Sequence, residues 1–154
     1  MNARKRNVYA GLLAIFCASP AVSFGAKCGG TNINNTVTWS PTEIVKGTTL
    51  SILRFTSVIV SDDPSAPFHL VSGECVGSFL ISPDGKTSSS GYCSRKDKDG
   101  DVLNEEWAGT GGGVGTLKLL GGTGKFAKAV GAAQFRHTPL YGTTASVRWT
   151  GDCQ

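Results

Sequence analysis

The sequence predicts an all-β protein, a closed eight-stranded antiparallel barrel held by two disulfides. The first observation is that no window after residue 25 keeps the periodicity of an amphipathic helix. The second is that runs rich in β-branched and aromatic residues alternate with clusters of glycine, proline and aspartate. The third is that these runs, about eight in number, follow one another at even spacing, which is typical of barrels and sandwiches.

Residues 1–25 are predicted to be a signal peptide, which leaves residues 26–154 as a single β-barrel domain. Basic residues at 4–6 precede an apolar run at 8–18 that is too short to span a bilayer. Gly25 is a small residue of the kind that precedes a cleavage site, and a cut a few residues earlier stays open. We therefore expect a secreted or periplasmic protein with no membrane span after cleavage.

The composition of the remaining chain excludes several classes of partner. Without the basic residues at 4–6, twelve basic and eleven acidic residues give a net charge of +1. No basic stripe is visible, so we expect no nucleic-acid partner. Four cysteines remain, and an even number in an exported chain favours two disulfides. None has the C-x-x-C spacing of a structural zinc site, and we expect no cofactor.

The strands are the β-rich runs between turn signals, taken in chain order. The first run is interrupted by Pro41, so its second half is placed as an extension. The run after it is the longest. Glycines inside later runs, Gly73, Gly77 and Gly131, predict the bends or bulges that barrel corners require. The predicted strands are residues 34–40 with an extension at 42–46, 49–61, 68–82, 86–96, 102–109, 116–120, 125–137 and 143–151.

The hairpin around residues 83–85 predicts how the cysteines pair. If this Pro-Asp-Gly stretch is a three-residue turn, residues whose numbers sum to 168 lie opposite each other. Cys75 and Cys93 meet that condition, and directly opposed residues have Cβ atoms about 4.5–5.5 Å apart, close enough to bridge after local adjustment. Cys28 and Cys153 then form the second disulfide, which joins the first and last strands of a closed barrel.

The stretch DKDGD at residues 97–101 is predicted to be a hairpin turn rather than a metal site. Asp99 and Gly100 form a two-residue turn signal, and the resulting register places Tyr92 opposite Trp107. Asp97, Asp99 and Asp101 also have the first acidic spacings of an EF-hand loop. That loop's glycine and final glutamate are absent, so calcium binding by these three residues is kept only as an alternative with another geometry.

The segment GGTGKFAKAVGAAQF at residues 121–135 predicts the wall of an apolar cavity. Its small residues Ala127, Ala129, Gly131 and Ala133 recur at every second position, so they would share one bare strand face. We expect these four to line the cavity and Lys128 to face solvent. The aromatic residues expected on the opposing wall are Trp107, Tyr92 and Trp149.

The same segment resembles the GGTG-x-F-x-x-A-x-G-x-A signature of plant dirigent proteins and the GGSG-x-F-x-G of allene oxide cyclases. With the stretches GYC and DKDGD and a following tryptophan, residues 88–151 resemble bacterial secreted members of the allene-oxide-cyclase-barrel-like family. The resemblance implies a calycin-like eight-stranded antiparallel barrel with an apolar cavity. It also leaves a homo-oligomer open, because plant relatives are often oligomeric. No catalytic residue is carried over, because the plant enzymes' catalytic positions lie outside the match.

Two charged residues are the candidates for chemistry. Glu105 shares a strand face with Leu103 and Trp107, so it points inward if they do, and a carboxylate in an apolar barrel can act as acid or base. Arg54 shares a strand face with Ile52, Val58 and Val60, so it could pair with such a carboxylate, and it could equally extend outward to solvent. The alternative, which the cost of an unpaired buried charge favours, is that Glu105 faces solvent at the barrel mouth.

The function predicted from these observations is the binding of a small apolar molecule in the barrel cavity, with no catalysis or only weak catalysis. Eight-stranded barrels have interiors just able to hold one small ligand. Two alternatives stay open. One is an isomerase of the allene-oxide-cyclase type, which works by holding a reactive substrate in shape. The other is a periplasmic protein-interaction or inhibitor barrel whose loops act.

Overall fold

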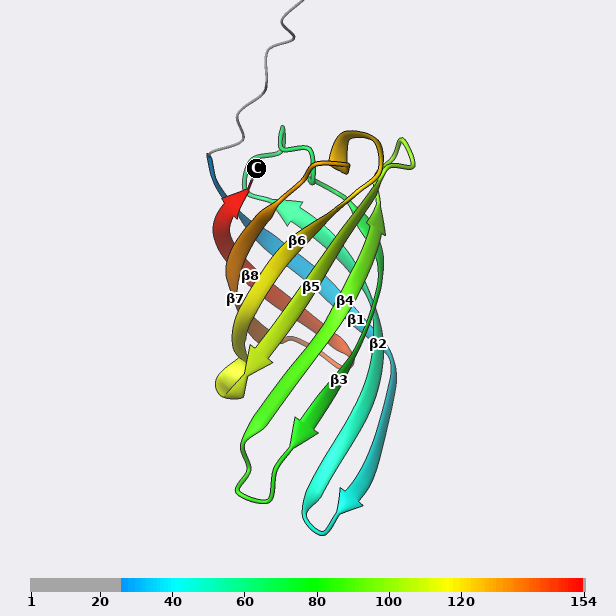
Figure 1. The fold of residues 1–154 in the computed structure, drawn as a ribbon, viewed down its shortest axis with the longest axis vertical. Helices are drawn as coiled ribbons and strands as arrows, with labels where there is room; N and C mark the ends of the chain where they lie inside the picture. The colour runs from blue at the N-terminus through cyan, green and yellow to red at the C-terminus, as the bar shows by residue number, and fades with distance from the viewer. Residues whose placement is uncertain (1–25, 154) are drawn as a thin grey trace, which may run out of the picture.

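The computed structural model describes residues 26–153, which form a closed barrel of eight antiparallel strands (Figure 1). Each strand pairs with the next along the chain, and β1 closes the barrel by pairing with β8. The strands are β1 (Ala26–Val45), β2 (Thr48–Ser61), β3 (Ser72–Ile81), β4 (Thr87–Lys96), β5 (Val102–Thr110), β6 (Val114–Gly122), β7 (Gly131–Pro139) and β8 (Thr144–Cys153). The predicted fold is confirmed, whereas the predicted signal peptide lies outside the described residues.

Two short 3₁₀ turns, η1 (Gly111–Gly113) and η2 (Gly124–Phe126), connect strands at opposite ends of the barrel (Figure 1). The β1–β2 and β3–β4 hairpins extend at the end that carries η1. Between Ala26 and Cys153 no helix has the length and hydrophobicity needed to cross a membrane.

Both predicted disulfides are confirmed. Cys75 lies directly opposite Cys93 in the β3–β4 ladder, with their Cα atoms 4.0 Å apart. The turn between these strands is the predicted one, because Gly85 has a positive φ of 76° and the N–H of Ser82 donates to the carbonyl of Lys86. The second bridge, Cys28–Cys153, joins β1 to β8 across the closure of the barrel.

The predicted register of the β4–β5 hairpin is wrong by one residue. Lys96 pairs with Val102, and the N–H of Asp97 donates to the carbonyl of Asp101, so the turn has three residues instead of two. Trp107 therefore lies opposite Gly91 instead of Tyr92. A two-residue turn of this kind needs positive φ at both central positions, and in this turn only Gly100 has it, at 87°. The longer turn is held by the carboxylate of Asp97, which accepts the N–H groups of Asp99 and Asp101 at 2.8 and 2.9 Å.

The predicted strand at residues 125–137 is wrong over its first half. β7 begins only at Gly131, and the chain before it forms η2 and a turn. Phe126 explains the difference, because its side chain is 2% exposed and packs into one end of the barrel instead of alternating along a strand. Ala127 and Ala129 therefore do not share a strand face with Ala133.

The apolar core fills the barrel end that η2 covers. Phe126 packs there with buried residues of several strands, and the ring of Phe68 meets that of Trp149 edge-on at 5.8 Å. This burial closes one end of the barrel to water. The other buried members of the cluster are Ile59, Val71, Leu103, Leu117 and Trp149.

The strand glycines allow close approach instead of bending the strands. Gly77 and Gly91 pair with each other, and a Cβ on either would lie 2.5 Å from a ring carbon of Trp107. A Cβ on Gly73 would likewise meet the backbone of the neighbouring strand. None of the three glycines Gly73, Gly77 and Gly131 lies at a bulge, because the ladders shift register elsewhere, as between Asn104 and Glu105.

Candidate functional site

A cavity of about 510 Å³ occupies the barrel interior towards the end that carries η1 and the β7–β8 loop. Its wall is made by inward residues of all eight strands, because side chains of a strand alternate between the two faces. Apolar groups dominate this wall, and Phe55 and Trp107 lie with ring centroids 6.0 Å apart. At the rim, Trp39 and Phe79 lie with ring centroids 5.5 Å apart.

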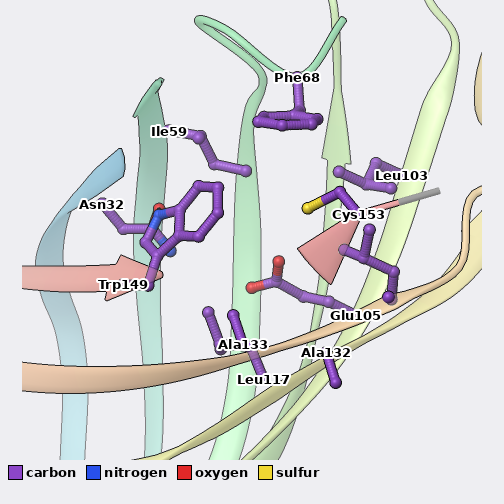
Figure 2. A pocket seen from close by; sticks show the side chains of 12 residues that line it. Asn32, Ile59, Phe68, Leu103, Glu105, Leu117, Ala132, Ala133, Trp149 and Cys153 are labelled. Atoms are coloured by element: carbon purple, nitrogen blue, oxygen red, sulfur yellow. The ribbon is translucent and has the colours of Figure 1, made fainter. Parts of the chain in front are cut away.

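A second, much smaller cavity of about 30 Å³ lies within the packed core, next to the large cavity. Figure 2 shows Trp149, Leu117 and Ala133 around it, with the carboxylate of Glu105 pointing among them. Glu105 also lines the large cavity, as do Asn32 and Leu117, so these three residues lie between the two spaces. The indole N–H of Trp149 is already used, since it donates to Oδ1 of Asn32 at 2.9 Å.

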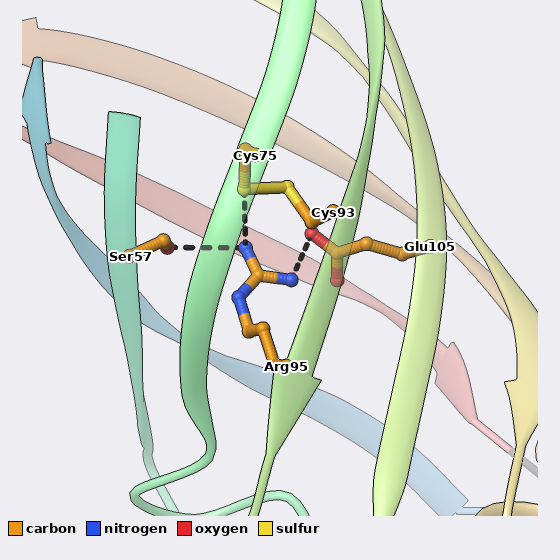
Figure 3. Close-up of a disulfide and its surroundings, with 5 residues drawn as sticks. All are labelled: Ser57, Cys75, Cys93, Arg95 and Glu105. Atoms are coloured by element: carbon orange, nitrogen blue, oxygen red, sulfur yellow. Dashed lines mark hydrogen bonds and ion pairs between the residues drawn. A yellow bond between two sulfur atoms is a disulfide. The ribbon is translucent and has the colours of Figure 1, made fainter. Parts of the chain in front are cut away.

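An ion pair between Arg95 and Glu105 forms the floor of the large cavity (Figure 3). Nη1 of Arg95 lies 2.5 Å from Oε1 of Glu105, and both side chains are at most 4% exposed. The contact between Arg95 and Glu105 is an ion pair, and its atoms are not aligned as a hydrogen bond requires. Nη2 of Arg95 donates to Oγ of Ser57 at 3.0 Å and lies 3.7 Å from Sγ of Cys75.

The strand register brings these two charges together. In β4, Arg95 lies two residues after Cys93, so both side chains point inward. Cys93 is directly opposite Glu105 in the β4–β5 ladder, which makes Arg95 the diagonal neighbour of Glu105. A buried charge is tolerated when it has such a partner, and the pair supplies a charged floor in a largely apolar wall.

The preferred solvent-facing placement of Glu105 is therefore wrong, and so is its expected partner. Arg54 lies on the outer face of β2, where it pairs with Glu74 at 2.9 Å and is well exposed. Sequence reasoning missed Arg95. The predicted disulfide places Cys93 in the interior, and residues two apart in a strand share a face. The position of Arg95, two residues after Cys93, is therefore the signal that could have identified it as an inward residue.

The expected cavity residues lie in several places. Trp107 lines the large cavity, and Gly131, Ala133 and Trp149 line the small one. Tyr92 is 60% exposed on the outer face of β4, which follows from the one-residue change of register. In the segment before β7, Ala127 is exposed, Ala129 packs against the apolar core and Lys128 faces solvent as expected.

The three aspartates of the β4–β5 turn are engaged with backbone groups and lysines. Asp97 pairs with Lys125, whose side chain also approaches Asp99 at 3.8 Å, and Oδ2 of Asp101 accepts the N–H of Lys125 at 3.0 Å. The Lys125 hydrogen bond holds the pKa of Asp97 below its ordinary value. Within residues 26–153, no three His, Cys, Asp or Glu side chains are grouped to hold a metal ion.

No family model matches the sequence, and no curated protein matches it. Solved structures do match. The pterocarpan synthase dirigent protein GePTS1 is 16% identical, with 83% of each chain covered and a TM-score of 0.50. Its fold and that of the present chain are similar. This dirigent-like barrel also matches a protein of unknown function from Clostridium acetobutylicum, at 10% identity and a TM-score of 0.51, over 82% of this chain and 99% of that one.

The dirigent-like fold confirms what the GGTG segment indicated about architecture. At these identities the likeness concerns the fold alone, so activity has to be argued from the cavity and its floor.

Proposed function

We propose that this chain is an exported dirigent-like barrel that binds one small, largely apolar molecule in its interior cavity. The observation that carries the proposal is the cavity itself, whose volume of about 510 Å³ falls in the range of ligand pockets, about 300–1,000 Å³. Two disulfides support export, because such bonds persist in oxidising compartments.

The arrangement of the walls supports an apolar ligand. The indole of Trp107 is seated on the Gly77–Gly91 pair, and Phe135 covers Gly115 on the opposite side of β5 in the same way. The absence of a side chain at these glycines lets large rings lie close to the backbone without filling the interior, so the wall is rigid and aromatic. A barrel acting through its loops alone has no need of such a space, which counts against the inhibitor alternative.

A pair of serine variants on β4 tests the proposal. Ser89 lines the cavity, whereas Ser88 points outward from the next position of the same strand. Ser89→Phe is expected to weaken binding of the neutral probe N-phenyl-1-naphthylamine at least tenfold, and Ser88→Phe to leave it unchanged. Equal binding by the two variants would contradict the proposal. Native mass spectrometry of protein from its own host then shows any retained ligand.

A second candidate function is isomerisation of the allene-oxide-cyclase type, and the buried Glu105–Arg95 pair favours it. Such a reaction depends mainly on holding a reactive substrate in one shape, and the carboxylate of Glu105 would stabilise the positive charge that develops on the carbon skeleton as the epoxide opens. Incubation with an allene oxide is expected to give a single enantiomer of the cyclic product, and Glu105→Gln to give the racemate. A racemic product from the unaltered protein would exclude this function.

A further inference from the structure

We propose that Cys93 is a covalent site for small uncharged thiols that enter the large cavity. The thiol sulfur joins Cys93 by thiol–disulfide exchange, and Cys75 leaves as a thiolate beside Arg95. The inference goes beyond reversible binding, and it rests on the proposed function only in requiring that the cavity admit small molecules.

One of the two sulfurs of the Cys75–Cys93 disulfide belongs to the cavity wall. Both side chains point into the barrel, because the residues on either side of each cysteine are exposed on its outer face. Cys93 lines the large cavity, whereas Cys75 is not among its lining residues. A thiol in the cavity therefore meets Cys93, and attack on that sulfur breaks its bond to Cys75.

A charged donor lies beside the sulfur that leaves. Nη2 of Arg95 is 3.7 Å from Sγ of Cys75, and the arginine is only 1% exposed. A neighbouring cation lowers the pKa of a thiol, and a disulfide opens faster when the departing thiol has a lower pKa. The guanidinium has five N–H groups, so it can serve Cys75 together with Ser57 and Glu105.

Glu105 provides a place for the proton of the thiol. It is directly opposite Cys93 in the β4–β5 ladder, and Figure 3 shows its carboxylate beside the disulfide. The incoming sulfur bonds to Cys93 and is oxidised, the Cys75–Cys93 bond breaks, and Cys75 is reduced to a thiolate. The proton passes to Glu105 and then to Cys75, which restores the Arg95–Glu105 pair. Arg95 thus faces one negative charge at each stage, and a neutral thiol adds no uncompensated charge.

The Cys28–Cys153 bridge is placed differently and serves as an internal comparison. Both of its cysteines are half-buried, so a thiol reaches them from the solvent regardless of the large cavity. The small cavity that Cys153 lines has a volume of about 30 Å³, which is about the space of one water molecule.

Benzyl mercaptan and glutathione test the inference, because the first is small and uncharged and the second is larger and charged. After incubation with an excess of either thiol, the exchange is stopped in acid, and the free thiols of the unfolded chain are alkylated and mapped. Benzyl mercaptan is expected to leave its adduct on Cys93 and a free thiol on Cys75. Glutathione should modify Cys93 more slowly by about tenfold or more, because its charges are costly to bury.

Three outcomes of the mapping overturn the inference. They are an adduct on Cys75 in place of Cys93, no adduct on Cys93, and equal reaction of the two thiols at Cys93. The last outcome would mean that thiols enter from the outer face, where a groove also passes both cysteines.

A pair of serine variants tests the route through the cavity. Ser89→Phe narrows the cavity and should slow formation of the Cys93 adduct by about tenfold or more, whereas Ser88→Phe, on the outer face, should leave the rate unchanged. Equal rates for the two variants overturn the route.

A variant of the floor tests the role of Arg95. Arg95→Met/Glu105→Leu replaces both charges by apolar side chains, and it should slow the adduct by about tenfold or more while N-phenyl-1-naphthylamine still binds. Arg54→Met is the matched control, because Arg54 lies on the outer face, and its rate should be that of the unaltered protein. An unchanged rate in the floor variant overturns the assigned role of Arg95. The thiol comparison and the serine pair decide the inference even where the floor variant does not fold.

Binding of N-phenyl-1-naphthylamine separates this inference from the proposed function. If Ser89→Phe weakens that binding but neither thiol modifies Cys93, the inference fails and the proposed function stands. If Ser89→Phe behaves like Ser88→Phe in both assays, the proposed function itself fails.

Discussion

At the scale of single residues, the burial of the charged side chains of Arg95 and Glu105 costs free energy of folding. Both are charged and almost fully buried, at 1% and 3% exposed. Removing an ion from water costs several kcal/mol even after relaxation of the protein, and mutual attraction offsets this only with good geometry. Ser57 and Cys75 give the guanidinium further contacts, yet Nε of Arg95 has no partner among residues 26–153.

Removing one partner of this pair is expected to be far more damaging than removing both. Glu105→Ala should lower the free energy of unfolding by about 3–5 kcal/mol, because it leaves the buried guanidinium of Arg95 without a counter-charge. The double variant Arg95→Met/Glu105→Leu should recover most of that loss, since apolar residues of similar volume need no partner. Urea denaturation measures both.

The exposed pair Arg54–Glu74 is the control for this experiment. Its side chains are 55% and 69% exposed, so Glu74→Ala should cost only about 0–1 kcal/mol. A loss as small in Glu105→Ala would contradict the coupling of the two buried charges.

The pair also shows which part of the site is readable from sequence. The inward direction of Arg95 follows from Cys93 two positions earlier, because side chains of a strand alternate. Its contact with Glu105 depends on the register of two strands, and that register depends on a three-residue turn. The solvent-facing expectation for Glu105 was reasonable only while its partner was unknown.

At the scale of elements, the β4–β5 turn determines which residues meet at the floor. Gly100 has a φ of 87° in this turn, with nothing within 4 Å of the position of a Cβ. Gly100→Val is therefore expected to destabilise the fold by about 1–2 kcal/mol through backbone strain alone, because β-branched residues resist positive φ. Thermal unfolding measures the effect. Lys98→Val places the same side chain at a neighbouring position without positive φ, and an equal loss there would contradict the strain argument.

The Asp97–Lys125 contact in the same turn predicts a dependence of stability on acid. The folded state holds the pKa of Asp97 below its ordinary 3.8, chiefly through the hydrogen bond with Lys125. The resulting stabilisation is present above that ordinary value and is lost as the pH falls through the lowered folded pKa. Asp97→Asn keeps the side-chain oxygen that accepts the backbone N–H groups, removes the charge and replaces the oxygen that faces Lys125 with an NH2 group.

The melting temperature of Asp97→Asn should therefore lie below that of the unaltered protein at pH 7, and the difference should shrink in acid. Asp99→Asn is the control, because the side chain of Asp99 is 56% exposed, accepts its hydrogen bond from Lys98 and lies 3.8 Å from Lys125, farther than Asp97 does. A difference for Asp97→Asn that stays constant down to low pH would show that its charge contributes nothing.

The segment before β7 shows where a local pattern misleads. Small residues at alternate positions are typical of a strand with a bare face, and the same residues fit a turn equally well. Phe126 decides between the two, because its ring packs with Leu103, Leu117 and Trp149 of three different strands. No local window contains that cluster, so the start of β7 was not predictable from residues 121–135 alone.

At the scale of the whole molecule, barrel closure was predictable because the signals were local and repeated. Each hairpin carries its own glycine or proline turn, and even spacing of the strands allows a closed sheet. The cavity volume was not predictable in this way. The volume depends on how side chains from all eight strands pack in the interior. It also depends on glycines such as Gly77 and Gly91, which let the ring of Trp107 lie close to the backbone.

The two disulfides are expected to contribute unequally, because they close loops of different length. Cys28–Cys153 spans 125 residues and Cys75–Cys93 spans 18. In the chain-entropy model these loops correspond to about 5 and about 3 kcal/mol. A variant with Cys75→Ala and Cys93→Ala keeps only the long-range bridge, and the reciprocal variant keeps only the short one.

Each variant is unfolded in urea with and without dithiothreitol, so that the sequence, and with it the packing, is the same in both measurements. The free energy of unfolding should fall by about 5 kcal/mol on reduction of the Cys28–Cys153 variant and by about 3 kcal/mol in the reciprocal one. The Cys28–Cys153 bridge joins β1 to β8, the two strands whose pairing closes the barrel. The larger fall is expected for this bridge because it restricts nearly the whole described chain in the unfolded state. Equal losses, or a larger loss for Cys75–Cys93, would show that the short bridge acts through the floor around Arg95 instead of through chain entropy.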